Sequence, residues 1–374
     1  MPIASPEHPA VTSWLDGLDA DQYDANVTAS VRLATQDGAP APDGSGAGRT
    51  TSWDYGAYVA TGETNEINDY AREEAAAGAE ALLFRLYQQP GVDDIRAILD
   101  KLPVRQLGLH TSLRYPGQDP AELFRDLVRY LRRAGVDPRS VSGSVDFDPL
   151  LDWSEPPFPP LIRLLFFVSR WMPDFRVLQV NAAGFNNGID GADTELALAL
   201  AKGAQYLLEI KARDYPIALA NRHLKFAFTV GTSFYGDVAK LRAFRALWSK
   251  VLEELGLDNP PLAQIAAHTD IGTMTDDETT NHTKLHLQAL AADLGGADLL
   301  FLAPAHGPQA SATPAGRALT RQVLAAFDPE DSLTDNVPVD HVYLDDLTIA
   351  LVKAAWSRYR TVQDQGGFAE VTEL

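Results

Sequence analysis

The stretch RVLQVNAAGFNNGIDGADTELALALAK, residues 176–202, decides the fold. Its first part, RVLQVNA, is apolar and rich in β-branched residues, which predicts a short buried strand. A loop rich in Gly and Asn follows at residues 184–191, and the run TELALALAK then has the amphipathic pattern of a helix. Strand, loop and helix form one βα unit, whose loop is the usual place for functional residues in a parallel α/β protein. The polar residues of this strand end and loop are Asn181, Asn186, Asn187 and Asp190.

The same alternation continues along most of the chain. Helical patterns with an acidic start and a closing glycine, such as residues 119–135 and 276–296, lie between apolar runs. Eight strands alternating with helices over about 250 residues predict a (β/α)₈ TIM barrel. A doubly wound open sheet is the alternative, although no G-x-G-x-x-G motif follows the first strand. The predicted strands are ALLFRL (81–86), RQLGLH (105–110), VSGSVD (141–146), RVLQVN (176–181), QYLLEI (205–210), LKFAFTV (224–230), AQIAAH (263–268) and ADLLFLA (297–303).

The chain divides into two regions near Trp53. Residues 1–52 are the least regular and contain a turn-rich linker at 37–48, so we interpret them as an N-terminal arm that docks on the barrel or on a partner. Residues 53–374 form the predicted barrel. Its closing C-terminal helix is expected at 347–367, after a loop-like excursion at 331–346.

Composition excludes several classes of function. The chain has 374 residues, 45% of them apolar, a formal net charge of −20 and no cysteine. The negative charge argues against nucleic acid or an anionic membrane as a partner, and the lack of cysteine excludes disulfides and thiolate chemistry. The N-terminus lacks the pattern of a signal peptide, and the longest apolar run, LIRLLFFV, is too short to span a bilayer. We therefore expect a cytoplasmic protein.

Acidic residues and a histidine stand at the ends of two predicted strands. Asp146 and Asp148 lie at the end of the strand at 141–146, and His268 and Asp270 lie at the end of the strand at 263–268. Asp146 at a barrel mouth can act as a general base, and Asp146, His268 and Asp270 are residue types that bind zinc. The alternative that we favour for the two strand-end aspartates is capping of the next helix.

Three further groups have structural alternatives. His282 and His286 are four residues apart, but without an intervening H-E-x-x-H glutamate a helix surface is the favoured interpretation. The Gly-Asn loop can bind an anion through backbone N–H groups or can be a tight connection that needs positive φ angles. Lys240, Arg242 and Arg245 can bind phosphate, but we favour the outer, solvated face of a long helix.

Long segments of the chain agree in order and spacing with one known family. They include ADTELALALAKGAQYL (192–207), VAKLRAFRALW (238–248), NHTKLHLQALAADLGGAD (281–298) and residues 342–371, together with a W-x₄-Y motif at Trp53 and Tyr58. These segments resemble the barrel of adenosylcobalamin-dependent methylmalonyl-CoA mutases. The segment SWLDGLDADQYDANVTASVRLATQDG resembles the N-terminal arm of the smaller, β-type mutase chain.

The resemblance implies a catalytic mouth in which the reactive pair is missing. In catalytic members, a Tyr-His pair follows the strand that matches 176–181, and its His contacts the thioester carbonyl. Ala183 and Gly184 occupy these positions here. The Gly-Asn loop resembles that of the non-catalytic β chain instead.

Other substrate contacts implied by the resemblance are also replaced. The Arg that pairs with the substrate carboxylate corresponds to Pro159, with Arg163 one helical turn away. A Gln near the same group corresponds to Asp146, whose charge repels an anionic substrate. An Arg that lies on the CoA side of the substrate in catalytic members corresponds to Gly56. The Tyr that these members have two residues later is retained as Tyr58. The loss of charge pairing and carbonyl polarisation removes what this chemistry needs for positioning.

Cofactor binding is expected elsewhere. Catalytic mutases carry a cobalamin-binding domain after the barrel, with a D-x-H-x-x-G motif that supplies the cobalt ligand, and this sequence contains no such motif. We expect no cofactor or metal in this chain, and adenosylcobalamin in a large partner subunit. The residues expected to line a vestigial mouth are Tyr58, Asp146, Asn181, Asn186, Asn187 and His268.

Three hypotheses follow, in order of preference. The first is a non-catalytic small-subunit-like barrel that forms a heterodimer with a catalytic large subunit, with a homodimer possible in isolation. The second is an active acyl-CoA mutase barrel that uses a separate cobalamin-binding chain. The third is a barrel recruited to metal- or carboxylate-based chemistry.

Overall fold

The computed structural model describes most of the predicted barrel. The described residues are 54–59, 64–86, 90–112, 121–148, 150, 158–185, 191–258, 262–303, 313–325 and 341–371. The predicted arm and linker at 1–52 lie outside them. None of the helices in these ranges combines the length and the apolar character that a bilayer-crossing segment needs.

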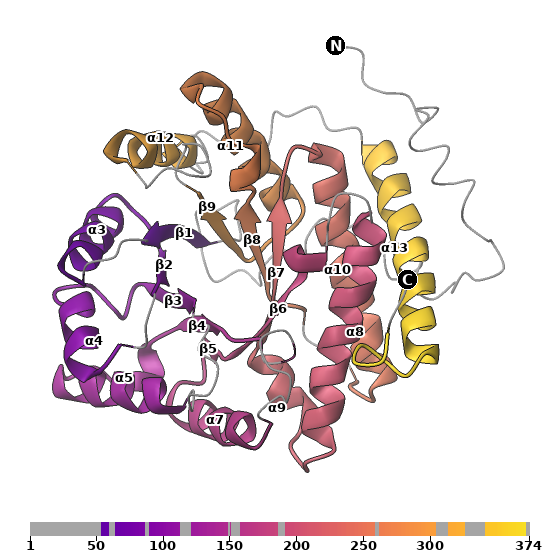
Figure 1. Ribbon diagram of the computed structural model, residues 1–374, viewed down its shortest axis with the longest axis horizontal. Helices are drawn as coiled ribbons and strands as arrows, with labels where there is room; N and C mark the ends of the chain where they lie inside the picture. Colours follow the sequence, from indigo (N-terminus) through magenta and orange to yellow (C-terminus); the bar gives the residue numbers. More distant parts are fainter. Residues whose placement is uncertain are drawn as a thin grey trace.

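Parallel strands form the centre of the molecule, in the order β5-β4-β3-β2-β1-β9-β8-β7-β6 (Figure 1). Only Val177 separates β5 from β6, so these two segments are halves of one strand and the chain itself joins the two ends of the sheet. The N–H of Gln179 also donates to the carbonyl of Phe147, just after β4, at 3.0 Å. The predicted eight-stranded TIM barrel is thereby confirmed. The strands are β1 (Asp54–Val59), β2 (Ala81–Arg85), β3 (Gly108–Ser112), β4 (Gly143–Asp146), β5 (Phe175–Arg176), β6 (Leu178–Asn181), β7 (Leu224–Val230), β8 (Ile265–Thr269) and β9 (Leu299–Leu302).

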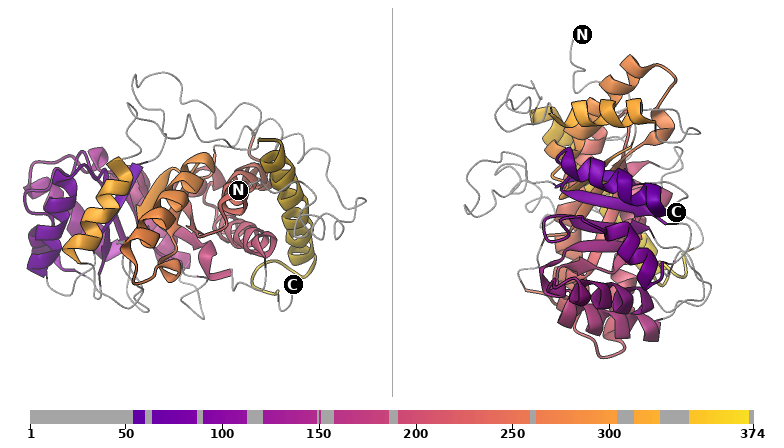
Figure 2. Two further views of the ribbon diagram at one scale, coloured as in Figure 1. Left: turned by 90° about the horizontal axis from the view of Figure 1, so that it is seen from above. Right: turned by 90° about the vertical axis from the view of Figure 1, so that its left-hand side faces the viewer.

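Helices surround these strands and cover their outer face (Figures 1 and 2). Each strand of the barrel is followed by at least one helix, as the (β/α)₈ pattern requires. The barrel helices are α3 (Thr64–Ala76), α4 (Val92–Leu99), α5 (Ala121–Arg133), α7 (Phe158–Trp171), α8 (Ala192–Lys211), α9 (Ile217–Arg222), α10 (Phe234–Glu254), α11 (Glu278–Leu294) and α12 (Pro314–Ala325). The closing helix is α13 (His341–Asp364), which is longer than predicted and includes residues expected to be a loop.

Two element predictions were wrong. QYLLEI, predicted as a strand at 205–210, is the last part of α8, because Tyr206, Leu207 and Ile210 are buried at a spacing that a helix also satisfies. The first barrel strand, β1, was not predicted, since its sequence DYGAYV is short and contains Asp and Gly. One predicted strand is part of a helix and one real strand was not predicted. The predicted number of eight strands was therefore right, although one of the eight segments was not.

The closing helix α13 forms an outer layer over α8 and α10 (Figures 1 and 2). Nε of Arg358 on α13 lies 2.5 Å from Oδ2 of Asp193 in the first turn of α8. Residues Leu196–Leu207 of α8 are buried almost continuously. A helix enclosed in this way carries apolar or small residues around its circumference, as ALALAK does.

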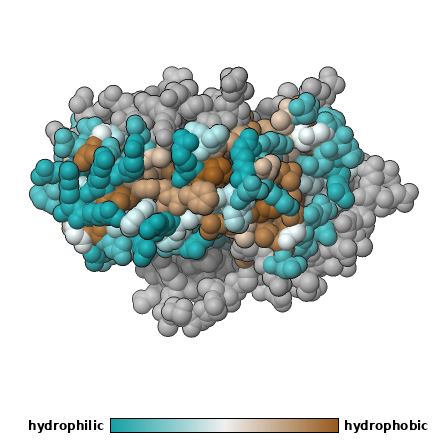
Figure 3. All heavy atoms as spheres, turned by 90° about the horizontal axis from the view of Figure 1, so that it is seen from below, coloured by the Kyte–Doolittle hydropathy of each residue, from teal (hydrophilic) through white to brown (hydrophobic). Residues whose placement is uncertain are grey.

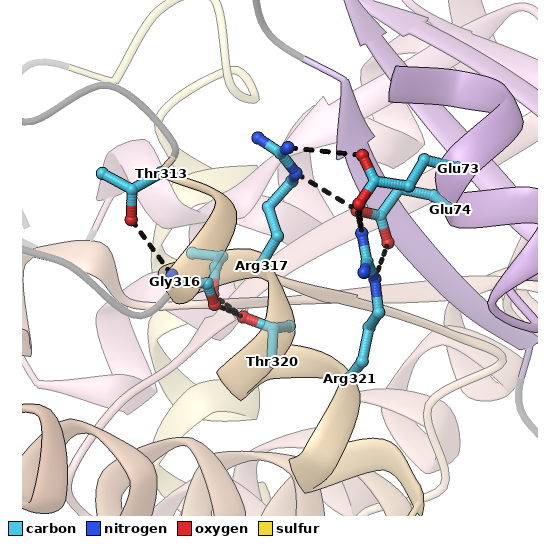
Figure 4. Close-up of polar contacts among 8 residues, drawn as sticks. Glu73, Glu74, Thr313, Gly316, Arg317, Thr320 and Arg321 are labelled. Atoms are coloured by element: carbon cyan, nitrogen blue, oxygen red, sulfur yellow. Dashed lines mark hydrogen bonds and ion pairs between the residues drawn. The ribbon is translucent and has the colours of Figure 1, made fainter. Parts of the chain in front are cut away.

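A cluster of charges joins the first and last helices of the barrel, α3 and α12 (Figure 4). Arg321 Nη2 lies 2.7 Å from Glu74 Oε1 and 2.8 Å from Glu73 Oε1, and Arg317 Nη2 lies 3.3 Å from Glu73 Oε2. Because α3 follows β1 and α12 follows β9, this cluster clamps the β1–β9 pair from outside.

One face of the molecule has a band of exposed apolar surface. Figure 3 shows hydrophobic residues gathered across the middle of the face at the bottom of Figure 1, with hydrophilic residues beside them. α7 lies on this side, and its Phe166 is 58% exposed although its ring packs edge-on against Tyr215. Exposed apolar surface of this kind is common at protein interfaces.

Candidate functional site

The carboxyl ends of the barrel strands surround a cavity of about 650 Å³. This is the end of a TIM barrel at which ligands bind, and the volume is in the range of small-molecule sites. The polar residues that line it include four of the predicted mouth residues. These four are Tyr58, Asp146, Asn181 and His268. The predicted Asn186 and Asn187 lie outside the described residues.

Apolar side chains fill part of the barrel interior next to the cavity. Ala81, Leu83, Ala266, Leu299 and Phe301 form one buried cluster against Tyr58. The ring of Phe301 occupies the space that a Cβ at Gly56 would take. An arginine, which the family resemblance implies at the position of Gly56, has no room here.

Tyr58 and His268 form a pair at the mouth. The Tyr58 hydroxyl lies 2.7 Å from Nδ1 of His268, whose ring stacks on Phe301 with centroids 5.0 Å apart. Burial lowers the pKa of His268 to about 3, with smaller contributions from the charges of Lys225 and Arg85, and burial raises the pKa of Tyr58 to about 12. Both side chains are therefore neutral at physiological pH, and a neutral pair provides polar contacts rather than charge.

Asp146 faces the cavity, where Gln179 binds it. Nε2 of Gln179 donates to Asp146 Oδ1 at 2.5 Å. Beneath them, buried Lys225 donates to Ser144 Oγ at 2.5 Å, and Ser144 Oγ lies 2.7 Å from His110 Nδ1. Burial lowers the pKa of Lys225 to about 8, and the nearby charge of Asp146 opposes this shift.

Asp148 is not among the residues that line the cavity, and it has a structural role. It accepts hydrogen bonds from Lys202 Nζ at 2.7 Å and from the Tyr206 hydroxyl at 2.5 Å, both on α8. The backbone N–H of Asn181 donates to it at 3.2 Å. Asp146 thus lines the cavity and Asp148 ties the end of β4 to α8. Most of residues 149–157 lie outside the described ranges, so the capping of the next helix by these aspartates stays a prediction.

The structure gives the metal hypothesis no support within the described residues. No group of three or more His, Asp or Glu side chains in those ranges is placed to hold a metal ion. Asp146, His268 and Asp270 line the same cavity. However, Asp270 Oδ1 accepts the N–H of Gly272 and caps the short 3₁₀ helix η4 (Ile271–Thr273).

The basic residues of α10 do not form a solvated face, so that prediction was also wrong. Lys240 is 4% exposed and its Nζ contacts the Thr229 carbonyl at 2.8 Å and Glu195 at 3.3 Å. Arg242 donates to the Leu294 carbonyl, and Arg245 donates to the carbonyls of Gly296 and Ala263. These cations bind protein groups on the neighbouring βα units. His282 and His286 lie half-buried on α11, with ring centroids 4.4 Å apart.

Ala183 and Gly184, where the resemblance implies the reactive pair, carry no catalytic group. Ala183 lines the cavity with a methyl group, and nothing among the described residues lies within contact of a Cβ built on Gly184. Pro159 and Arg163 are exposed on α7 and do not line the cavity, so Arg163 does not replace the substrate arginine.

Two residues of the site were not predicted. Arg85 at the end of β2 and Gln179 within β6 both line the cavity. In the runs ALLFRL and VLQV, Arg85 and Gln179 are the single strongly polar residues among apolar ones near a strand end. That pattern could have predicted both residues as part of the site.

A parallel eight-stranded barrel with a polar cavity at the carboxyl ends of its strands belongs to the class of TIM-barrel enzymes and their relatives. The family model for methylmalonyl-CoA mutase matches residues 87–373, and the chain belongs to that family. Its curated relatives include methylmalonyl-CoA mutase small subunits. The one from Porphyromonas gingivalis is 25% identical and covers 82% of this chain and 52% of the relative.

Further relatives carry small- and large-subunit names. A probable small subunit from Mycobacterium bovis is 27% identical over 85% of this chain and 53% of its own length. A large subunit from Streptomyces virginiae is 23% identical over 86% of this chain and 48% of its own length. The chain thus spans about half the length of the curated relatives it matches. A solved structure titled as a dipeptide epimerase from Methylococcus capsulatus, complexed with Mg ion, aligns with a TM-score of 0.35 at 15% identity, over 77% of this chain and 66% of that one.

Proposed function

We propose that this chain is a non-catalytic, small-subunit-like barrel that pairs with a large mutase chain. The large chain supplies the substrate site and adenosylcobalamin for the interconversion of methylmalonyl-CoA and succinyl-CoA. The names of the relatives support a partnership between subunits. The absence of cysteine and the negative charge favour the cytoplasm as the place of this complex.

The observation that carries the proposal is the chemistry at the end of the fifth barrel strand. Where the resemblance implies Tyr and His, Ala183 and Gly184 provide no group that can polarise a thioester carbonyl. Asp146 stands where the resemblance implies a Gln near the substrate carboxylate, and its charge opposes an anionic group at that position. A barrel that is intact around a mouth without the reactive pair is explained when its outer surface serves an interface, and the exposed apolar band supports that role.

The residues of this chain do not fit cobalamin. No histidine in the sequence follows an aspartate by two positions, as the cobalt-ligating motif requires. Among the residues that the structure describes, His268 is the imidazole that lines the mouth, and it is already bound to Tyr58. We expect titration of the chain with adenosylcobalamin to leave the visible spectrum of the cofactor unchanged.

Co-expression with the large mutase chain of the same organism tests the pairing. We expect size-exclusion chromatography with light scattering to show a complex that contains one copy of each chain. If the two chains elute separately, with and without adenosylcobalamin, the pairing is wrong.

An active barrel with a separate cobalamin-binding chain remains the second candidate. The pair formed by Tyr58 and His268 in an open cavity favours it. Turnover of methylmalonyl-CoA by this chain, supplied with a cobalamin-binding chain but without a large subunit, would support it over the pairing.

A further inference from the structure

One buried acceptor at the mouth has no partner in the described part of the chain. Gln179 is 3% exposed, lines the cavity, and donates from Nε2 to Asp146 Oδ1. A carboxylate accepts hydrogen bonds, so this contact fixes the orientation of the amide and leaves Oε1 as the second polar atom. Among the described residues, Gln179 Oε1 is buried without a hydrogen-bond donor.

An unpaired buried carbonyl costs free energy, about 1–3 kcal/mol. A ligand in the cavity that carries an O–H or N–H group recovers that cost by donating to Oε1. The adjacent charge of Asp146 favours a donor at this position and disfavours an anionic group. This side of the cavity is therefore selective for hydrogen-bond donors.

The lining of the same cavity also includes a cation. Arg85 is the only Arg or Lys among the described residues that line it. Its guanidinium lies 4.9 Å from the centre of the Tyr58 ring, and its side chain is exposed. In the described ranges it has no ion pair with a carboxylate. Guanidinium groups bind carboxylates in a bidentate manner, so Arg85 is placed to receive an anionic group from the cavity.

We infer that the mouth binds a small carboxylate that also carries a hydrogen-bond donor, an amino or a hydroxyl group. The carboxylate contacts Arg85 and the donor contacts Gln179 Oε1. Leu83, Leu86, Ala227 and Ile271 give the cavity apolar walls for a short aliphatic chain. This ligand is not an acyl-CoA, and its binding does not depend on pairing with a large subunit.

Six-carbon probes that differ in one group test the inference on the full chain. Isothermal titration calorimetry at neutral pH compares L-norleucine, 2-hydroxyhexanoate, hexanoate and 2-aminohexane, the last of which has no carboxylate. We expect norleucine or hydroxyhexanoate to bind at least tenfold more tightly than hexanoate and 2-aminohexane, because these lack the donor or the anion. The tighter of the two donor-bearing probes identifies an amino or a hydroxyl group as the preferred donor.

Matched variants locate the site. We expect Arg85→Gln and Gln179→Met to weaken binding of the tighter probe at least tenfold. Arg96→Gln, on the exposed side of α4, should leave binding unchanged. Gln288→Met is the control for Gln179, since Gln288 is also buried with an unpaired Oε1 in the described ranges but does not line the cavity.

Three outcomes overturn the inference. They are no binding of either donor-bearing probe, binding of hexanoate that equals theirs, and binding that survives in Arg85→Gln. If Gln179→Met does not fold, Arg85→Gln still decides the test. Arg85 is exposed, so its replacement leaves no buried group without a partner and should not prevent folding. Since the titration uses the isolated chain, its failure is distinct from a failure to pair with a large subunit.

Discussion

Lys202 and Asp148 form a buried ion pair between α8 and the end of β4, with Nζ 2.7 Å from Oδ2 and both side chains at most 3% exposed. Asp148 lies two residues beyond Asp146, yet the two carboxylates serve different purposes. Asp146 belongs to the cavity, whereas Asp148 fixes the start of the loop that follows β4 to the helix of the next βα unit. The frame of the mouth is therefore held by contacts that do not depend on a ligand.

Replacing one member of this pair should be strongly destabilising. In Lys202→Met, Asp148 stays buried without its cation, and we expect the free energy of unfolding to fall by about 3–5 kcal/mol. Urea denaturation followed by far-UV circular dichroism measures the change. Lys211→Met, at the exposed end of the same helix, is the control and should change stability by less than about 0.5 kcal/mol. In the double variant Lys202→Met/Asp148→Leu, much of the lost stability should return. Equal effects of the Lys202 and Lys211 variants would show that the pair is unimportant.

Lys225 should make stability depend on pH in the alkaline range. Its pKa is lowered to about 8 from 10.5, so between these values the unfolded chain binds the proton that the folded protein has released. The contribution of Lys225 to the free energy of unfolding is then least favourable below pH 8 and rises as pH increases towards 10.5. Relative to Lys225→Met, the wild type should gain about 1.4 kcal/mol per pH unit in this window. Urea denaturation at several pH values measures the difference, and a difference that is constant from pH 7 to 10 would contradict the assigned environment.

The clamp between α3 and α12 should stabilise the seam where the first and last strands pair. Arg317→Met removes contacts to Glu73, to the buried Glu74 and to the ring of Tyr70, and we expect a loss on the order of 1–3 kcal/mol. Hydrogen exchange should quicken first in β1, α3 and α12. Arg125→Met breaks an exposed pair with Glu122 on α5 and should cost less than about 0.5 kcal/mol. Faster exchange spread evenly over all strands would argue against a local clamp.

Local patterns were sufficient to predict most of the barrel. LKFAFTV was predicted at the bounds of β7, because a continuous run of apolar and β-branched residues suits a strand buried on both faces. QYLLEI is also a short, mostly apolar run, but it continues a helix that began at Ala192. A run of six residues is too short to distinguish the helical from the strand period. β1 depends for its stability on pairing with β9, which lies far away in the sequence.

The candidate site could be predicted only in part, because its contacts join distant residues. Functional residues of a TIM barrel lie at the carboxyl ends of its strands, and this rule correctly placed Asp146 and His268 at the mouth. It could not show that Lys225 binds Ser144, which is 81 residues away, or that Lys240 is buried between acidic residues of two helices. Basic residues on a long helix are usually solvated, and the sequence alone gives no sign of the buried partners that reverse this rule.

In the proposed function, this chain supports the mutase reaction without performing it. The most direct test is turnover of methylmalonyl-CoA by the proposed complex with a large mutase chain when this chain carries Tyr58→Phe. Tyr58 is the substrate-contacting position that the family resemblance implies is retained, and the change removes only the hydroxyl that pairs with His268. We predict a kcat equal to that of the complex with the unchanged chain, and no turnover by this chain alone with adenosylcobalamin. A fall in kcat of about a hundredfold, the size of effect expected when a positioned catalytic group is lost, would contradict the claim and place chemistry in this barrel.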